Sequence, residues 1–212
     1  MEKGKFAKGV VSVSLSGPQV KILSTYFGKG FGAGSLPVDM DGSIMEKLKA
    51  ATDKGGNETA VMQFNLLDQA DLGVVVGLPF ILRAVVKGLT DQASLLGQLI
   101  DRASVSKITS VVIGWPADDL SIIVLCCEDE FFAAAIPAAP EIKEFAAKLI
   151  RAAVADKSGS DNVEVEIDLE NDTGLPCLQT IQEACKVMAG ELLRVAAKLG
   201  TMMSPVKMFV AE

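Results

Sequence analysis

The residues best suited to contact a ligand are the alternating glycines of the segment that follows Phe27. Its candidate binding residues are Gly28, Lys29, Gly30, Gly32, Gly34 and Ser35. Glycines let backbone N–H groups approach a phosphate or carboxylate closely, and the lysine adds positive charge. The spacing also matches the dinucleotide-binding pattern G-x-G-x-x-A. In such a site the glycines lie directly before a helix N-terminus, whereas here Leu36 and Pro37 separate them from the next predicted helix. The segment is a candidate contact for a small anion, an assembly loop or a connector.

Two Gly-Leu-Pro segments predict helix N-termini that extend this candidate site. Proline suits the first turn of a helix, because its missing N–H would have no partner there anyway. We therefore expect Gly77 and Gly174 at helix starts, with backbone N–H groups available to an anion. Cys177 follows the second segment, and a helix N-terminus lowers the pKa of a thiol, so it is the cysteine expected to react most readily. Phe80 stands at the equivalent position after the first segment, which makes any such chemistry asymmetric.

The absence of histidine removes several catalytic mechanisms. Ser-His-Asp and Cys-His catalysis and HExxH zinc chemistry all require this residue. The cysteine spacings do not resemble CxxC, so we expect small buried hydrophobic residues rather than metal ligands at Cys126, Cys127, Cys177 and Cys185. The carboxylate pairs Asp39/Asp41 and Asp118/Asp119 could bind a cation or transfer protons, but they are also ordinary turn and helix-start residues. We assign no catalytic residue, metal ligand or cofactor, and the sequence favours a protein that is not an enzyme.

The composition points to a protein that contacts itself. The 212 residues are 50% hydrophobic but only 5% aromatic, so the excess is aliphatic. Such a surplus favours extensive subunit contact, although a well-filled core would also explain it. The net charge of −7 argues against nucleic acid. The apolar run from Leu72 to Leu82 is too short to span a bilayer, and the N-terminus resembles no signal peptide, so we expect a cytoplasmic protein without a membrane partner.

The sequence predicts an α+β fold with an internal duplication. Alternating positions in one segment recur at constant spacing in another: Ala60, Met62, Phe64 and Leu66 match Val163, Val165, Ile167 and Leu169. The two Gly-Leu-Pro segments match at a shorter spacing, as one insertion in a diverged repeat would produce. We therefore predict repeats over 1–106 and 107–212, related by a pseudo-two-fold axis.

Each repeat is predicted as a β-β-α-β-α unit, with helices packed on a mixed sheet. The first two strands of each unit form a hairpin in this prediction: Val10–Leu15 with Val20–Ser24, and Ile108–Trp115 with Leu120–Cys126. Helices are expected over Gly42–Asp53, Thr90–Ser104, Ala139–Asp156 and Leu175–Leu199, and a final strand over Val206–Val210.

Two functions remain open at this point. The first is a self-assembling structural or scaffold protein of the cytoplasm, a subunit of a homo-oligomeric ring, tube or shell. The alternative is a protein that binds a small anionic ligand, or a histidine-independent enzyme, with its site at the cleft between the repeats or at Gly28–Gly34. The aliphatic surplus and the poor catalytic inventory favour assembly.

Overall fold

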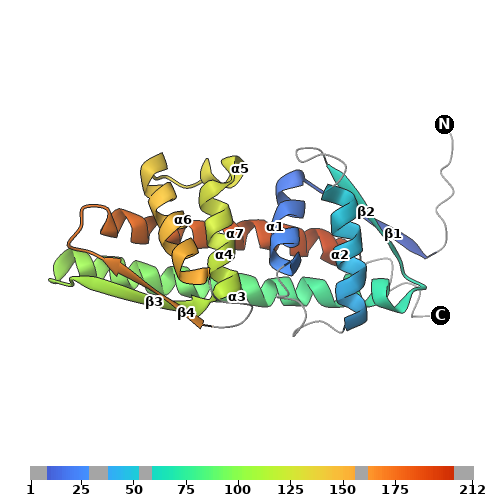
Figure 1. Cartoon of the computed structure of the whole chain (residues 1–212). Helices are drawn as coiled ribbons and strands as arrows, with labels where there is room; N and C mark the ends of the chain where they lie inside the picture. The colour runs from blue at the N-terminus through green and yellow to red at the C-terminus, as the bar shows by residue number, and fades with distance from the viewer. Residues whose placement is uncertain (1–8, 29–37, 53–58, 156–161, 203–212) are drawn as a thin grey trace. The chain divides into compact units, whose positions relative to one another are not determined.

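The computed structural model describes residues 9–28, 38–52, 59–155 and 162–202. In chain order the elements are β1 (Val10–Leu15), α1 (Gly17–Gly28), α2 (Val38–Thr52), β2 (Ala60–Asn65), α3 (Gln69–Val105), β3 (Ser110–Pro116), α4 (Ala117–Glu128), α5 (Glu130–Ala133), α6 (Pro140–Val154), β4 (Asn162–Asp168) and α7 (Gly174–Thr201). The chain is thus an α+β protein, as predicted, and it is mainly helical (Figure 1).

Contacts divide the described residues into two compact units. The first contains 9–28, 38–52, 59–83 and 192–202, and the second contains the described part of Ala84–Glu191. The long helices α3 and α7 contribute residues to both units. Because these units are defined by contacts in space, the sequence repeats 1–106 and 107–212 stay a prediction.

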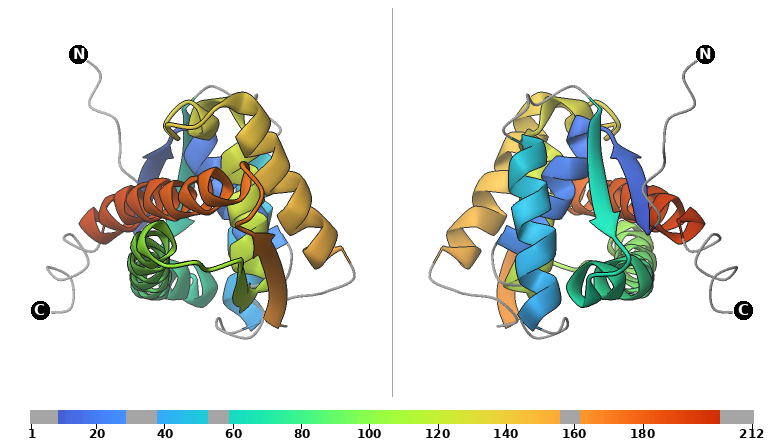
Figure 2. Two further views of the ribbon diagram at one scale, coloured as in Figure 1. Left: turned by 90° about the vertical axis from the view of Figure 1, so that its left-hand side faces the viewer. Right: turned by 90° about the vertical axis from the view of Figure 1, so that its right-hand side faces the viewer.

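The first unit is built on the antiparallel pair of β1 and β2. Val13 lies opposite Met62 and Leu15 lies opposite Ala60, and all four side chains are buried. The residues between them point to solvent, which is the alternation that the sequence predicts for a sheet with one covered face. Helix α2 packs against β2 and α1 (Figure 2, right). A two-stranded sheet is marginal alone, so these helices supply most of the core.

The second unit is built on the antiparallel pair of β3 and β4. The buried pairs are Val111 with Ile167, Ile113 with Val165 and Trp115 with Val163. Helices α4 and α6 lie side by side, and α6 packs against β4 (Figures 1 and 2). The predicted helix over Ala139–Asp156 is confirmed as α6, with Pro140 in its first turn. The predicted helix over Gly42–Asp53 overlaps α2, which begins four residues earlier, at Val38, and ends at Thr52.

The two predicted hairpins are wrong. Val20–Ser24 lies in α1 and Leu120–Cys126 lies in α4, so each strand is followed at once by a helix. The segment from Ser16 to Gln19 is half of a capping box rather than a turn, since the Gln19 side chain accepts the Ser16 N–H at 3.2 Å. The Pro-Ala-Asp-Asp segment is likewise a helix start: Pro116 is the N-cap of α4. Acidic side chains in a first turn stabilise the helix dipole.

Because Val20–Ser24 and Leu120–Cys126 are helical, the sheets differ from the prediction as well. The predicted mixed sheet is replaced, in the part of the chain that the structure describes, by two separate antiparallel pairs, β1–β2 and β3–β4. The predicted strand over Val206–Val210 lies outside the described residues.

Helix α3 is longer than the sequence suggests. It begins at Gln69, so the prediction that Gly77 starts a helix is wrong. Asp68 caps the true start by accepting the N–H groups of Ala70 and Asp71 at 2.9 and 3.0 Å. Pro79 lies inside the helix, where it interrupts one backbone hydrogen bond without ending the helix.

By length and composition alone, α3 could also cross a membrane. An 18-residue stretch of it has a mean hydropathy of 1.9, and only 33% of that stretch is buried. Buried core helices and membrane spans both pass such a test. In this part of α3 the large apolar side chains that are exposed are Val76 and Phe80.

Candidate functional site

The predicted glycine site is only partly described. Gly28 is the last residue of α1, whereas Lys29, Gly30, Gly32, Gly34 and Ser35 lie outside the described residues. Gly77 lies well inside α3, so its backbone does not form a helix N-terminus and gives no support to an anion site in the first unit.

Gly174 does begin α7, as predicted, but its backbone is already used. Its N–H donates to the Asn171 carbonyl at 2.9 Å. A Cβ at this position would lie 1.9 Å from the Asp168 carbonyl oxygen, so the glycine is needed for close packing of two backbone segments. The structure thus gives Gly174 a packing role.

The cysteines form a buried group between α4 and α7. All four are free thiols and all are buried, as the sequence predicts. Burial raises the pKa of Cys177 to about 12, so desolvation outweighs the helix N-terminus near it. Burial also raises the pKa of Cys127 and Cys185 to about 12, with smaller contributions from the nearby Cys177 at Cys127 and from Asp119 at Cys185. These thiols are therefore poor nucleophiles in the folded protein.

The carboxylate pair of α4 is held inside the second unit. Asp118 is buried, and the Gln92 side chain of α3 donates to Asp119 Oδ2 at 3.5 Å. Burial raises the pKa of Asp119 above its usual value. Within the described ranges, no group of three or more His, Cys, Asp or Glu side chains has a geometry that could hold a metal ion. The two carboxylates thus lie where α3 and α4 pack together, and Asp119 links the two helices through Gln92.

In the first unit, the buried carboxylate of Asp71 already has its partners. It accepts the Asn65 N–H at 2.7 Å and pairs with Lys47 at 3.2 Å. Lys47 also lies 5.3 Å from the centre of the Phe64 ring. These contacts join α2, β2 and the start of α3, and they give the carboxylate a structural role.

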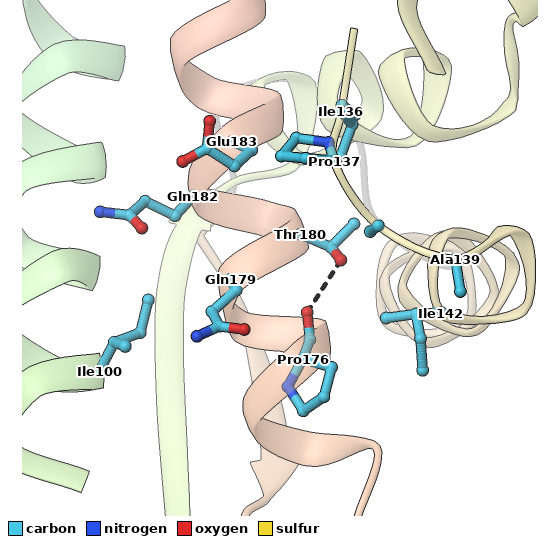
Figure 3. A pocket seen from close by; sticks show the side chains of 11 residues that line it. Ile100, Ile136, Pro137, Ala139, Ile142, Pro176, Gln179, Thr180, Gln182 and Glu183 are labelled. Carbon is cyan, nitrogen blue, oxygen red and sulfur yellow. Dashed lines mark hydrogen bonds between the residues drawn. The ribbon is translucent and has the colours of Figure 1, made fainter. Parts of the chain in front are cut away.

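The second unit contains a cavity of about 480 Å³, large enough for a small molecule. It lies over the first half of α7, with one wall from α3 and another from the α5–α6 linker (Figure 3). Its polar lining is supplied by α7: Gln179, Thr180, Gln182 and Glu183. Sequence reasoning missed these residues. Their signal was a cluster of polar side chains at one-turn spacing on an otherwise apolar helix.

A second exposed feature is apolar and lies on α3 in the first unit. Val76 is 36% exposed and Phe80 is 61% exposed. They are one turn apart, so they share one face of the helix. Both residues belong to the helix that contains the apolar stretch described above.

Comparison with models of known protein families, with curated proteins and with solved structures finds no match for this chain. The function must therefore be inferred from its own residues.

Proposed function

We propose that this protein is a self-assembling structural or scaffold protein, a subunit of a homo-oligomeric ring, tube or shell, and we favour this role over an enzymatic one. The observation that carries the proposal is the apolar face of α3, where Val76 and Phe80 are exposed in a stretch that is only 33% buried. Exposed apolar side chains that share one helix face can contribute to an interaction site in a soluble protein.

The energy available at this face is large enough to matter. A phenylalanine side chain buries about 150–250 Å² when it is fully covered, so the 61% exposed Phe80 leaves roughly 100–150 Å² in water. Covering that area would contribute about 3 kcal/mol per subunit, and a symmetric contact would gain it twice. Val76 adds to the same face.

An internal duplication, with a pseudo-two-fold relation between repeats, belongs to this proposal. Both halves of the chain follow the order strand, helix, helix, strand, long helix, apart from the short α5. Helices α1 and α4 each have 12 residues and each begins directly after a strand. This agreement supports one ancestral unit, and repeated units commonly stack or assemble.

A cytoplasmic location is the compartment that we propose. All four cysteines are free thiols, which is typical of a reducing environment. A ligand site at the cleft between the repeats or at Gly28–Gly34, for a small anion, stays an expectation from the sequence.

The test is a charged substitution on the α3 face. Phe80→Lys should reduce the native mass to that of the 22.3 kDa monomer, because a buried unpaired ammonium is costly. Phe131→Lys is the matched control, since Phe131 on α5 is 56% exposed and is the same residue type. Light scattering after size exclusion measures both.

Two outcomes contradict the proposal. One is an unchanged oligomer in the Phe80→Lys protein. The other is recovery of the wild-type protein in the membrane fraction, which would assign the apolar stretch of α3 to a lipid bilayer instead.

A further inference from the structure

The cavity in the second unit has an amphipathic lining. Its floor is the face of α7 that carries Pro176, Gln179, Thr180 and Glu183 (Figure 3). The walls are apolar, with Ile100 from α3 and the residues Ile136, Pro137, Ala138, Ala139 and Ile142 around the start of α6. A ligand that fits must therefore combine an apolar body with a polar group.

The hydrogen-bonding groups on the floor include the Gln179 amide, which can donate or accept, and several acceptor oxygens. The Thr180 hydroxyl donates its proton to the Pro176 carbonyl at 2.8 Å, which leaves its oxygen to accept. The Gln182 Nε2 donates to the Ala93 carbonyl of α3 at 3.0 Å, so its Oε1 takes no part in that bond. A carboxylate is an acceptor only, and Glu183 adds one.

The charge of the cavity lining favours a cationic ligand. Among the described residues that line it, Glu183 is the only one with a charged side chain, and no lysine or arginine lines it. Lys186 pairs with Glu183 at 2.7 Å from the next turn of α7. This lysine is exposed and does not line the cavity, so a cationic ligand competes with a weak surface ion pair.

We propose that this cavity binds a small organic amine: a primary ammonium group on an aliphatic body. The ammonium donates to the Glu183 carboxylate. The aliphatic body packs on the isoleucine side chains of the walls, Ile100 and Ile142 among them. The preferred ligand is thus a cation, opposite in charge to the anion that the glycine-rich segment suggests.

Hexylammonium is the probe that tests this proposal, with hexanoate as a probe of the same length and opposite charge. Isothermal titration calorimetry of the full-length protein should show saturable binding of hexylammonium and weaker or no binding of hexanoate. Glu183→Gln should weaken hexylammonium binding about tenfold, the loss of one charge-assisted hydrogen bond. Glu170→Gln, an exposed glutamate outside the cavity lining, should leave the affinity unchanged.

A second variant moves the affinity in the other direction. Lys186→Met removes the competing ammonium and should tighten hexylammonium binding severalfold. A gain in affinity cannot result from a misfolded protein, so it separates a ligand site from a folding defect. Hexanoate binding as tightly as hexylammonium would overturn the proposal. Absence of hexylammonium binding to the wild-type and Lys186→Met proteins, or an unchanged affinity after Glu183→Gln, would do so too.

Discussion

The close approach of Gly174 to the Asp168 carbonyl makes this glycine the position most sensitive to a single added methyl group. In Gly174→Ala the new Cβ would lie 1.9 Å from the Asp168 oxygen, 2.8 Å from its carbonyl carbon and 3.0 Å from Leu169 Cα. All three atoms belong to the backbone, so no side chain can rotate away. The end of β4 and the start of α7 would have to separate.

The expected cost is about 3 kcal/mol of unfolding free energy, at the upper end for overpacking because the obstacle is backbone. Helix propensity does not account for this loss, since alanine is otherwise the better helix former. Gly190 gives the matched control. It lies in the same helix, and a Cβ added there would meet no atom within 4 Å. Gly190→Ala should therefore stabilise the protein by about 1 kcal/mol.

Urea unfolding followed by circular dichroism, at one fixed protein concentration, measures both variants. The two substitutions add the same methyl group to the same helix and should shift the midpoint in opposite directions. A Gly174→Ala protein within about 0.5 kcal/mol of wild type would refute the packing role of this glycine.

Three further results are expected. Asp119→Asn should raise the unfolding free energy at neutral pH, because burial raises the folded-state pKa of the Asp119 carboxyl and so penalises its charged form. In denaturation experiments across acidic pH, this gain should shrink as pH falls through the folded-state pKa of Asp119. It should vanish below the unfolded-state pKa, where both states are protonated, and a gain that does not change with pH would contradict this. Asp71→Leu should cost about 3 kcal/mol in urea unfolding, since it leaves Lys47 and a backbone N–H without their partner, and a change near zero would contradict that role. A thiol reagent such as dithionitrobenzoate should label Cys177 and the other cysteines only after unfolding, because they are buried; rapid labelling of the native protein would contradict this.

The strands could be predicted from the sequence because their buried faces alternate cleanly. Met62 and Phe64 point inward and Val61 and Gln63 point outward, and β3 and β4 follow the same rule. A helix with one covered face repeats every 3.6 residues, so alternation with a period of two indicates a strand.

The helices α1 and α4 could not be separated from strands in the same way. Leu120–Cys126 is a short, continuous apolar run, and such a run fits a buried strand or a buried helix equally well. The deciding signals lie before it, in Pro116 and the acidic first turn, and in the Ser16–Gln19 capping box of α1. These signals also fit turns, because helix starts and turns use the same residue types.

The cavity residues were missed for a different reason. Gln179, Gln182 and Glu183 form a site only because Ile100 of α3 and the α5–α6 linker are brought beside them by the fold. Local sequence patterns do not indicate which segments, distant along the chain, come together in the fold. Gly77 was misplaced because its Gly-Leu-Pro segment matches a true helix start at Gly174, whereas α3 continues through Pro79.

The native mass of the untagged wild-type protein tests the proposed assembly most directly. We would measure it by light scattering after size exclusion, with negative-stain imaging of the same fractions. The proposal predicts a particle several times heavier than the 22.3 kDa chain, with repeated, symmetric features in the images. A monomer at every concentration would contradict it.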